Sequence, residues 1–459
     1  MIGKINVGGG GEGITPQGKV LAATAASAVA AGDFVKFVPG SLTKGSWSSA
    51  PGYGSDAGWA CCALDDSRVF VLFGQSRAYA AIVTVDGVSS VWGTAVPVAT
   101  GFTTYGISRQ SIVLIDSNTV FVSYIVQSNS VAQILGQICT IANDNTITVG
   151  SAVTLVSDAR PDYRRSYAIA AVPGWESTNI FLAYQDSSSN LASAIANVSG
   201  STITVGNKYT LVADTNAARY LSVVVDNNTV YIAHSRGTYS HLYLAYGNTM
   251  DTTLDFIDDI ALSTQDYAVA QGLAAVKVGK TIAVVHGYGS GNAYLFGCLV
   301  DISQTLNGSP VFVNDTQIYS GAFSIFNQYF SVEVIPGSKP MICVYFCFGY
   351  LPSGAVTYTY YIKQNFCTWD NCVMQSLTSP TVYTLQPPHG WQGPHVLATC
   401  TLGNFKSLIC EASGGSSYVN SIATAAQIAK VTATTDAIAG IAKTNAAAAA
   451  SCDIYVPNV

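Results

Sequence analysis

Arginines and tyrosines recur together at one position of a repeating pattern in this 459-residue sequence. Arg109, Arg164 and Arg219 occupy equivalent positions in successive repeats, and each has a tyrosine nearby. A guanidinium group beside an aromatic ring and a carboxylate can bind a saccharide, because the ring stacks on the sugar and the charged groups form directional hydrogen bonds. The candidate saccharide-binding residues are Tyr105, Arg109, Asp162, Tyr163, Arg164, Arg219, Tyr220, Asp266, Tyr267 and Trp391.

The same residues allow a structural and an enzymatic alternative. The tyrosines could cap the ends of the repeats, with packed rings and hydrated hydroxyl groups. The three arginines could clamp a carboxylate in a sialidase-like glycosidase. Glycoside hydrolysis requires two carboxyl groups in one cleft, but we expect Glu12 in an N-terminal arm, Glu176 on the opposite face, and Glu333 and Glu411 within strands. The candidate aspartates remain as acids, but no S-x-D-x-G-x-T-W repeat occurs, so we expect no enzyme and no catalytic residue.

Two histidines, His234 and His286, end equivalent strands of successive repeats. They could line one axis and bind a metal, but no carboxylate or third ligand recurs at that repeat position. We therefore expect neutral histidines in the core, with no metal site and no cofactor.

A pattern that recurs about every 50–65 residues predicts the strands that position the candidate binding residues. Each copy has an apolar segment, a short polar turn and a second apolar segment, which predicts a hairpin of buried strands. Two further strands follow, and the clearest fourth strands are Ile147–Asp158 and Ile203–Asp214. Because sheets in series bury both faces only when arranged radially, the sequence predicts an all-β, seven-bladed β-propeller with four-stranded blades. The hairpins are Ala60–Gly74, Ser111–Ile125, Tyr167–Gln185, Leu221–Ser235, Leu273–Gly287, Phe330–Phe346 and Val396–Ala412.

In such a ring, with the first strand of each blade innermost, two sets of loops share one face. They are the loops from the fourth strand to the next first strand, and those from the second strand to the third. The candidate residues belong to the first set, so we expect them together on this loop face.

The seventh repeat lacks a fourth strand, and Leu42–Ala50 resembles the fourth-strand pattern. We therefore expect this N-terminal strand to complete the last blade, which leaves no open edge between the first and last blades. The segments outside the ring are rich in Ala, Val and Thr. We predict an N-terminal arm over residues 1–17, a small β-barrel module from residues 18–40 and 428–459, and the propeller over residues 41–427.

Composition narrows the class of protein further. Only 10% of the residues are charged and the formal net charge is −6, which argues against a nucleic-acid-binding surface. We find no apolar run of the roughly 18 residues needed to span a bilayer, so we expect no membrane insertion. The 11 cysteines include Cys367 and Cys372, which could bridge a hairpin. We otherwise expect reduced thiols in a protein assembled in a cytoplasm.

The two ends of the chain carry a resemblance to phage proteins. The opening MIGKINVGGGG resembles tail- and fibre-associated proteins of phages that infect Gram-positive bacteria. Ala30–Val38 (AAGDFVKFV) and Ala437–Pro457 (AIAGIAKTNAAAAASCDIYVP) resemble the small β-barrel of phage virion proteins, including head-decoration proteins. The resemblance implies a structural virion protein that carries an inserted propeller.

Three functions are consistent with these patterns. The first is a tail-, fibre- or baseplate-associated virion protein whose propeller binds a host-surface saccharide or another virion component. The second is an architectural head- or tail-decoration protein without a ligand, and the third is a sialidase-like glycosidase. For the first two we expect contacts to other virion proteins through the arm and the barrel module, and a homo-oligomer on the particle, for which a trimer is our prediction.

Overall fold

The protein is described here from a computed structural model. It describes residues 18–25, 28–31, 33–39, 48–49, 58–74, 77–86, 89–99, 103–104, 107, 110–128, 131–160, 167–173, 178–213, 217–236, 241–250, 253–262, 270–289, 293–306, 309–321, 330–335, 341–350, 359–370, 373–376, 381–385, 396–402, 406–413, 416–424, 426–430, 440–442 and 451–457. All the secondary-structure elements within these ranges are β-strands. Among the same residues, no helix is long and apolar enough to cross a membrane.

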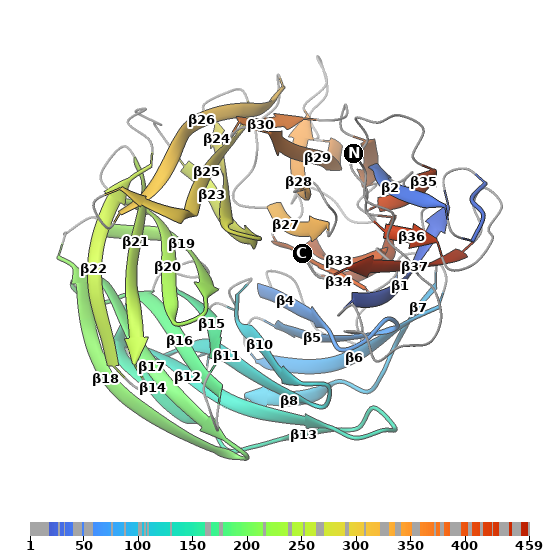
Figure 1. Cartoon of the computed structure of the whole chain (residues 1–459). Helices are drawn as coiled ribbons and strands as arrows, with labels where there is room; N and C mark the ends of the chain where they lie inside the picture. Colours follow the sequence, from blue (N-terminus) through green and yellow to red (C-terminus); the bar gives the residue numbers. More distant parts are fainter. Residues whose placement is uncertain are drawn as a thin grey trace, which may run out of the picture.

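The described strands between residues 48 and 424 form seven antiparallel sheets, here called sheets I to VII. Figure 1 shows these sheets arranged around a ring. The first strands β4, β10, β15, β19, β23, β27 and β32 contact one another in a closed series. The sheets are I, β4 (Gly58–Ala63), β5 (Arg68–Gly74), β6 (Ala78–Asp86), β7 (Ser89–Trp92) and β8 (Val96–Ala99); II, β9 (Thr103–Thr104), β10 (Ile112–Asp116), β11 (Thr119–Ser128), β12 (Val131–Ile141), β13 (Ile147–Val149) and β14 (Val153–Ala159); III, β15 (Tyr167–Pro173), β16 (Thr178–Gln185), β17 (Leu191–Ser199) and β18 (Thr202–Val212); IV, β19 (Ala217–Asp226), β20 (Thr229–Arg236), β21 (His241–Met250) and β22 (Thr253–Ala261); V, β23 (Ala270–Val278), β24 (Thr281–Gly289), β25 (Ala293–Leu306) and β26 (Ser309–Gly321); VI, β27 (Phe330–Ile335), β28 (Met341–Tyr350), β29 (Thr359–Asp370), β30 (Val373–Ser376) and β31 (Thr381–Leu385); and VII, β3 (Ser48–Ser49), β34 (Ser416–Thr424), β33 (Lys406–Ser413) and β32 (Val396–Thr401). This all-β arrangement is a β-propeller.

The first hairpin of each sheet coincides with one predicted from the repeat. The second strands are buried on both faces because they lie between neighbouring sheets; β5 and β16 are buried along almost their whole length. Short polar side chains close the first turns, as expected. Asp65 Oδ1 accepts hydrogen bonds from the Ser67 and Arg68 amides at 2.9 and 2.8 Å, and Asp116 Oδ1 accepts one from the Asn118 amide at 2.8 Å.

The outer strand is interrupted in sheets I, II and VI, a feature that the sequence analysis did not foresee. In sheet II, β13 and β14 both pair with β12, and the Gly150 amide between them donates to the Ile138 carbonyl at 2.8 Å. Gly93 donates to Ile82 at the same position of sheet I, also at 2.8 Å. Such bulges increase the local twist of a strand.

Buried apolar side chains fill the seams between sheets. Each of the six buried clusters found among the described residues draws its side chains from two neighbouring sheets. Buried Met374, for example, packs against Gly297 across the seam between sheets V and VI. The core is thus distributed around the ring, and sheets I to V each bury side chains against both neighbouring sheets.

Polar contacts also join the first strands near the axis. The Gln110 carbonyl accepts a hydrogen bond from the Ile169 amide at 2.9 Å, while its side-chain amide pairs with both the carbonyl and the amide of Val223 at 3.0 and 2.9 Å. Gln110 therefore links sheets II, III and IV. Thr399 Oγ1 donates to Glu333 Oε1 at 2.7 Å and links sheets VI and VII.

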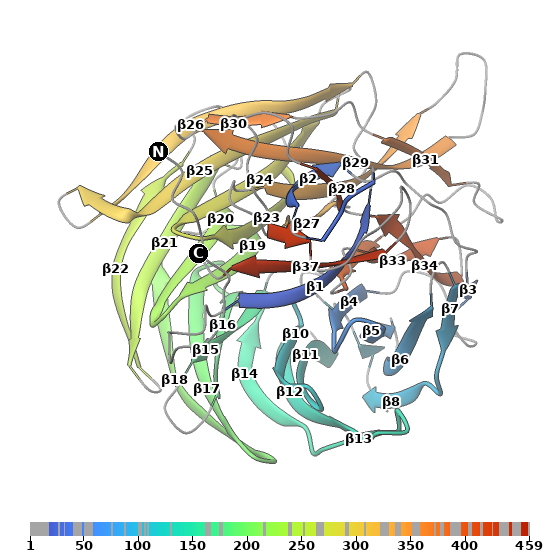
Figure 2. The same ribbon diagram turned by 45° about the vertical axis from the view of Figure 1, so that its right-hand side comes forward.

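The predicted closure of the last sheet is confirmed where the structure describes it. Ser48 and Ser49 of β3 pair with Val419 and Tyr418 of β34. An N-terminal strand therefore completes sheet VII, whose other strands come from the end of the ring segment. Figure 2 shows β3 beside β34 from a second direction.

Strands from the two ends of the chain form a closed barrel in the order β1-β35-β2-β36-β37. The blue and red strands lie together in Figures 1 and 2. Strand β1 pairs antiparallel with β37 from Gly18↔Pro457 to Thr24↔Ser451, and β2 pairs with β35 and β36. The third barrel strand begins at residue 426, two residues before the predicted module boundary at 428. The strands are β1 (Gly18–Ala25), β2 (Phe34–Pro39), β35 (Ala426–Lys430), β36 (Gly440–Ala442) and β37 (Ser451–Pro457).

Candidate functional site

Two of the ten predicted saccharide-binding residues lie in described strand, and the other eight fall outside the described residues. Arg219 and the half-buried Tyr220 belong to β19. In chain order, the other candidates fall between the last strand of one sheet and the first strand of the next, or beside β9 within sheet II. They are Tyr105, Arg109, Asp162, Tyr163, Arg164, Asp266, Tyr267 and Trp391. The predicted grouping of all ten therefore stays a prediction.

Strand β19 has an irregular register at Arg219 and Tyr220. Ala217 pairs with Arg236 and Leu221 with His234. Three residues of β19 thus lie opposite Ser235 alone. Bulges of this kind redirect side chains and are frequent beside functional sites. Repeat position alone predicted these two residues for the site, and the structure places their backbone opposite the end of β20, at the loop face.

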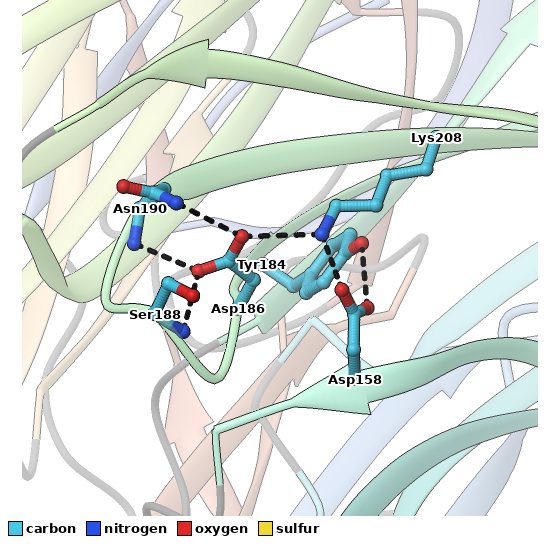
Figure 3. Close-up of polar contacts among 6 residues, drawn as sticks. All are labelled: Asp158, Tyr184, Asp186, Ser188, Asn190 and Lys208. Atoms are coloured by element: carbon cyan, nitrogen blue, oxygen red, sulfur yellow. Dashed lines mark hydrogen bonds and ion pairs between the residues drawn. The ribbon is translucent and has the colours of Figure 1, made fainter.

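A polar network lies at the loop face between sheets II and III (Figure 3). Lys208 of β18 bonds Asp158 of β14, and its Nζ also lies 3.1 Å from Oδ2 of Asp186. The Tyr184 hydroxyl donates to Asp158 at 3.2 Å, and Lys208 Nζ lies 5.8 Å from the centroid of the Tyr184 ring. Lys208 of sheet III thus connects the outer strand β14 of sheet II to the loop between β16 and β17 of its own sheet. Asp158 lies just before the segment that contains the candidates Asp162, Tyr163 and Arg164.

Asp186 forms the loop between β16 and β17. Its Oδ1 accepts the Ser188 and Asn190 amides, both at 2.9 Å, and its Oδ2 accepts the Asn190 side-chain amide at 3.1 Å (Figure 3). The carboxylate is only 5% exposed. Because it has fixed donors on both oxygens, Asp186 holds this loop of the loop face in a single conformation.

The shifts in pKa within this network favour the charged forms of Asp186 and Lys208. Burial opposes ionisation of Asp186, but hydrogen bonds from Asn190 and Lys208 outweigh it and lower the pKa of Asp186. Burial likewise opposes the charge of Lys208, but the hydrogen bonds that it donates to Asp158 and Asp186 raise the pKa of Lys208 above its usual value. Burial, with the nearby Asp158 charge, raises the pKa of Tyr184, so its hydroxyl stays protonated. The network is a charged tether between two sheets.

We expect Lys208→Met to lower the free energy of unfolding at neutral pH by about 1 kcal/mol, the upper range for exposed pairs, because Asp186 is nearly buried. The contribution from Asp186 is complete above the ordinary carboxyl pKa of about 3.9 and is lost as the pH falls through its lower folded value. The difference between variant and wild type should therefore shrink below about pH 4. Denaturant titrations at several pH values measure this difference in the free energy of unfolding. A difference that stays constant down to pH 2 would contradict a stabilising ion pair between Lys208 and Asp186.

A second polar cluster lies at the loop-face end of sheet IV. His234 Nε2 is 2.9 Å from Asp259 Oδ1, and Arg236 donates to Asp259 Oδ2 at 2.8 Å. The Arg236 guanidinium carbon lies 3.7 Å from the centroid of the Tyr243 ring, on which His234 also stacks at 5.7 Å. His234 is fully buried, whereas the Arg236 side chain is 26% exposed. The cluster combines a fixed ion pair with an aromatic platform near the surface.

The two clusters occupy equivalent positions in successive sheets with their charges exchanged. Strand pairing places His234 where sheet III has Tyr184, and Asp259 where it has Lys208. Arg236 correspondingly takes the position of Asp186. In the repeated sequence the equivalent of Asp158 is residue 214, which lies outside the described residues. The same scaffold position thus carries a cationic outer strand in one sheet and an anionic one in the next.

The structure tests several predictions about individual side chains. Both histidines are buried, as expected, and His286 stacks on Phe296 at 5.6 Å. No carboxylate recurs at their own repeat position, but His234 contacts the carboxylate of Asp259, which comes from the fourth strand of the sheet. Glu333 lies in β27, as expected. Among the described residues, no group of three or more His, Cys, Asp or Glu residues is arranged to hold a metal ion.

Cys367 is a free, buried thiol, and burial raises its pKa to about 12. Its suggested disulfide partner, Cys372, lies outside the described residues. A thiol of this kind behaves as a small apolar side chain of the seam between sheets V and VI.

Sequence reasoning missed Asp158, Asp186, Lys208, Arg236 and Asp259. For two of these residues the sequence contains a usable signal. Asp158 and Lys208 lie in the two clearest copies of the fourth strand, in a chain with only 20 basic residues. Their contact crosses from one sheet to the next, so it required the orientation of neighbouring sheets and not only the repeat.

Comparison with known proteins does not identify this chain. No family model matches the sequence, and no curated protein matches it. Among solved structures, a putative 6-phosphogluconolactonase from Bacteroides fragilis is 10% identical, with a TM-score of 0.44, over 71% of this chain and 86% of that chain. A sialidase from Trypanosoma rangeli is 9% identical, with a TM-score of 0.39, over 72% of this chain and 56% of that chain.

A fungal lectin from Aleuria aurantia is 15% identical, with a TM-score of 0.39, over 73% of this chain and 98% of that chain. It is described as a six-bladed propeller with a fucose recognition mode, whereas the described part of this chain contains seven ring sheets. Lectins and enzymes thus occur together among these structures. Likenesses of this size do not decide between binding and catalysis for this chain.

Proposed function

We propose that this chain is a structural bacteriophage virion protein of the tail, fibre or baseplate. In this proposal the terminal barrel and the N-terminal arm attach the chain to other virion proteins. Sheets I to VII act as the seven blades of a propeller that presents its loop face to a host-surface saccharide or to another virion component.

The observation that carries the proposal is the position of the ring within the chain. The ring segment begins after β2 and ends before β35, and both strands belong to the barrel, where they pair with each other. The ring is therefore an insertion held at both ends by one small domain. Such an arrangement suits a protein in which one part attaches and the other is displayed, and the phage-like segments Ala30–Val38 and Ala437–Pro457 contain most of β2 and all of β36 and β37.

The described chemistry of the loop face favours binding over catalysis. The carboxylates of both charged clusters are engaged in contacts within the protein: Asp186 accepts hydrogen bonds within its loop, and Asp259 contacts His234 and Arg236. Glu333, a conceivable acid, accepts a hydrogen bond from Thr399 near the axis. Paired carboxylates free to act as acid and nucleophile, which glycoside hydrolysis needs, do not occur among the described residues of the loop face.

Adsorption to host cells tests the proposal. Single aromatic contacts contribute on the order of 1 kcal/mol, so one propeller should bind weakly and many copies on a particle strongly. We expect multimerised protein to adsorb to host cells and purified wall glycans. Tyr163→Ala combined with Trp391→Ala should lower adsorption about tenfold or more, from two lost contacts of this size, with an unchanged melting temperature.

The alternatives predict different outcomes of the same experiment. If the multimerised protein never binds host envelopes, the architectural decoration protein replaces the receptor-binding one. Turnover of a fluorogenic glycoside panel would establish the sialidase-like enzyme instead. A particle reconstruction that resolves six or eight blades, or that places the barrel away from other virion proteins, would overturn the proposed architecture.

A further inference from the structure

The seam between sheets III and IV changes from apolar to polar at its loop-face end. Ala183, Leu191 and Ile195 of sheet III belong to the buried cluster that joins the two sheets. Side chains alternate along a strand, so Gln185 and Ser193 lie on the same surface of sheet III. Both are fully buried. Sheet III therefore presents two polar side chains toward sheet IV.

Sheet IV also has polar residues on the surface that faces sheet III. Ile232 and Ala245 belong to the same buried cluster, and by the same alternation His234, Arg236 and Tyr243 share their side of the sheet. These three residues, with Asp259, form the cluster of contacts described above. Two polar surfaces thus face each other across one seam.

Ser193 Oγ and His234 Nδ1 lie on opposite sides of this seam, and both are buried without a hydrogen-bond partner within the part of the chain that the structure describes. Nε2 contacts the Asp259 carboxylate, so Nδ1 on the other side of the imidazole ring is left for another partner. Leaving buried polar groups unpaired is costly, so such groups favour a site where a ligand or a water supplies the missing hydrogen bonds.

The exposed edge of the seam has the groups that hold a sugar. The Arg236 guanidinium carbon lies 3.7 Å from the centroid of the Tyr243 ring, and the hydrogen bond to Asp259 orients the guanidinium. A guanidinium that lies over the Tyr243 ring and has N–H donors beyond the one bonded to Asp259, together with deeper polar atoms, matches a pyranose, which offers a row of hydroxyl groups.

We propose that the loop-face end of the seam between sheets III and IV is a saccharide subsite. A pyranose unit lies against Arg236 and Tyr243 and directs hydroxyl groups toward Ser193 Oγ and His234 Nδ1. This inference rests on the proposed saccharide-binding function and assigns it to one seam of the ring.

Two variants test the subsite from its two sides. Ser193→Ala removes a hydroxyl that has no described protein partner, so the melting temperature should stay at or above that of wild type. If a sugar hydroxyl uses Ser193, affinity should fall about tenfold, as for one lost hydrogen bond. Arg236→Met should lower affinity by about tenfold or more, because a charged donor is lost. Arg68→Met is the matched control: Arg68 pairs with Asp65 at 2.5 Å on the opposite face, and its replacement should leave affinity unchanged.

The probes are methyl pyranosides of glucose, galactose, mannose, rhamnose and N-acetylglucosamine, titrated by saturation-transfer NMR, together with adsorption of the multimerised variants to host cells. Loss of binding in Ser193→Ala and Arg236→Met, but not in Arg68→Met, supports the subsite. If wild type and both variants adsorb equally, the subsite is wrong while the proposed function stands. If wild type binds neither pyranosides nor cells, both fail. Ser193→Ala that melts lower and binds normally would assign the hydroxyl to a structural water instead.

Discussion

Deletion of residues 1–51 should abolish the soluble fold. It removes β1 and β2, which pair with the three C-terminal strands of the barrel, and β3, which completes sheet VII. Strand β34 would then have an edge without a hydrogen-bonded neighbour, and the seam between sheets VII and I would lose β3. Exposed edges of this kind promote aggregation. We expect expression in the insoluble fraction, measured against the full chain under identical conditions.

The control is deletion of residues 1–16, which removes no described strand. This variant should remain soluble and melt within about 2 °C of the full chain, since surface changes outside packed elements usually have small effects. It should nevertheless attach poorly to the particle if the arm binds other virion proteins. A soluble, cooperatively melting chain that lacks residues 1–51 would show that neither the barrel nor the ring needs the N-terminal strands.

The strands could be predicted from the sequence because local signals define them. Apolar alternation and Asx turns recur in each copy, and β15 and β16 begin and end the predicted hairpin Tyr167–Gln185. The pairing of β3 with β34 was predicted from a resemblance between Leu42–Ala50 and the fourth-strand pattern, because a ring with one missing strand has one place for it. Regular repeats therefore reveal much of the scaffold.

The polar contacts of the loop face could not be predicted in the same way. Lys208 reaches Asp158, about one repeat earlier in the chain, and Gln110 reaches Val223 two sheets away. These contacts depend on the angle between neighbouring sheets and on bulges such as the one in β19, neither of which the apolar pattern encodes. Equivalent positions even exchange charge, Lys208 for Asp259, so the repeat is a poor guide to which sheet carries which chemistry.

Replacement of Trp59 by alanine should weaken the ring where its first and last sheets meet. Trp59 is fully buried in β4, stacks on Phe73 at 5.2 Å and lies 6.2 Å from Trp92. The same buried cluster includes Cys400 and Leu402 of sheet VII. Truncation of a buried tryptophan to alanine typically costs 3–5 kcal/mol, from lost transfer energy and the cavity left behind. We expect a loss of about 4 kcal/mol in the free energy of unfolding.

Trp59→Phe separates packing from polarity at the same position. Trp59 Nε1 is buried without a hydrogen-bond partner among the described residues. Phenylalanine removes this unpaired N–H and keeps much of the ring contact, so the loss should be only about 1–2 kcal/mol. Denaturant unfolding followed by circular dichroism measures both variants. Because sheets I and VII are joined only when the ring closes, Trp59→Ala should also increase amide hydrogen exchange in β32 and β4 more than in β19 and β20. Equal destabilisation by both variants, or exchange that rises uniformly around the ring, would mean that Trp59 does not hold this seam.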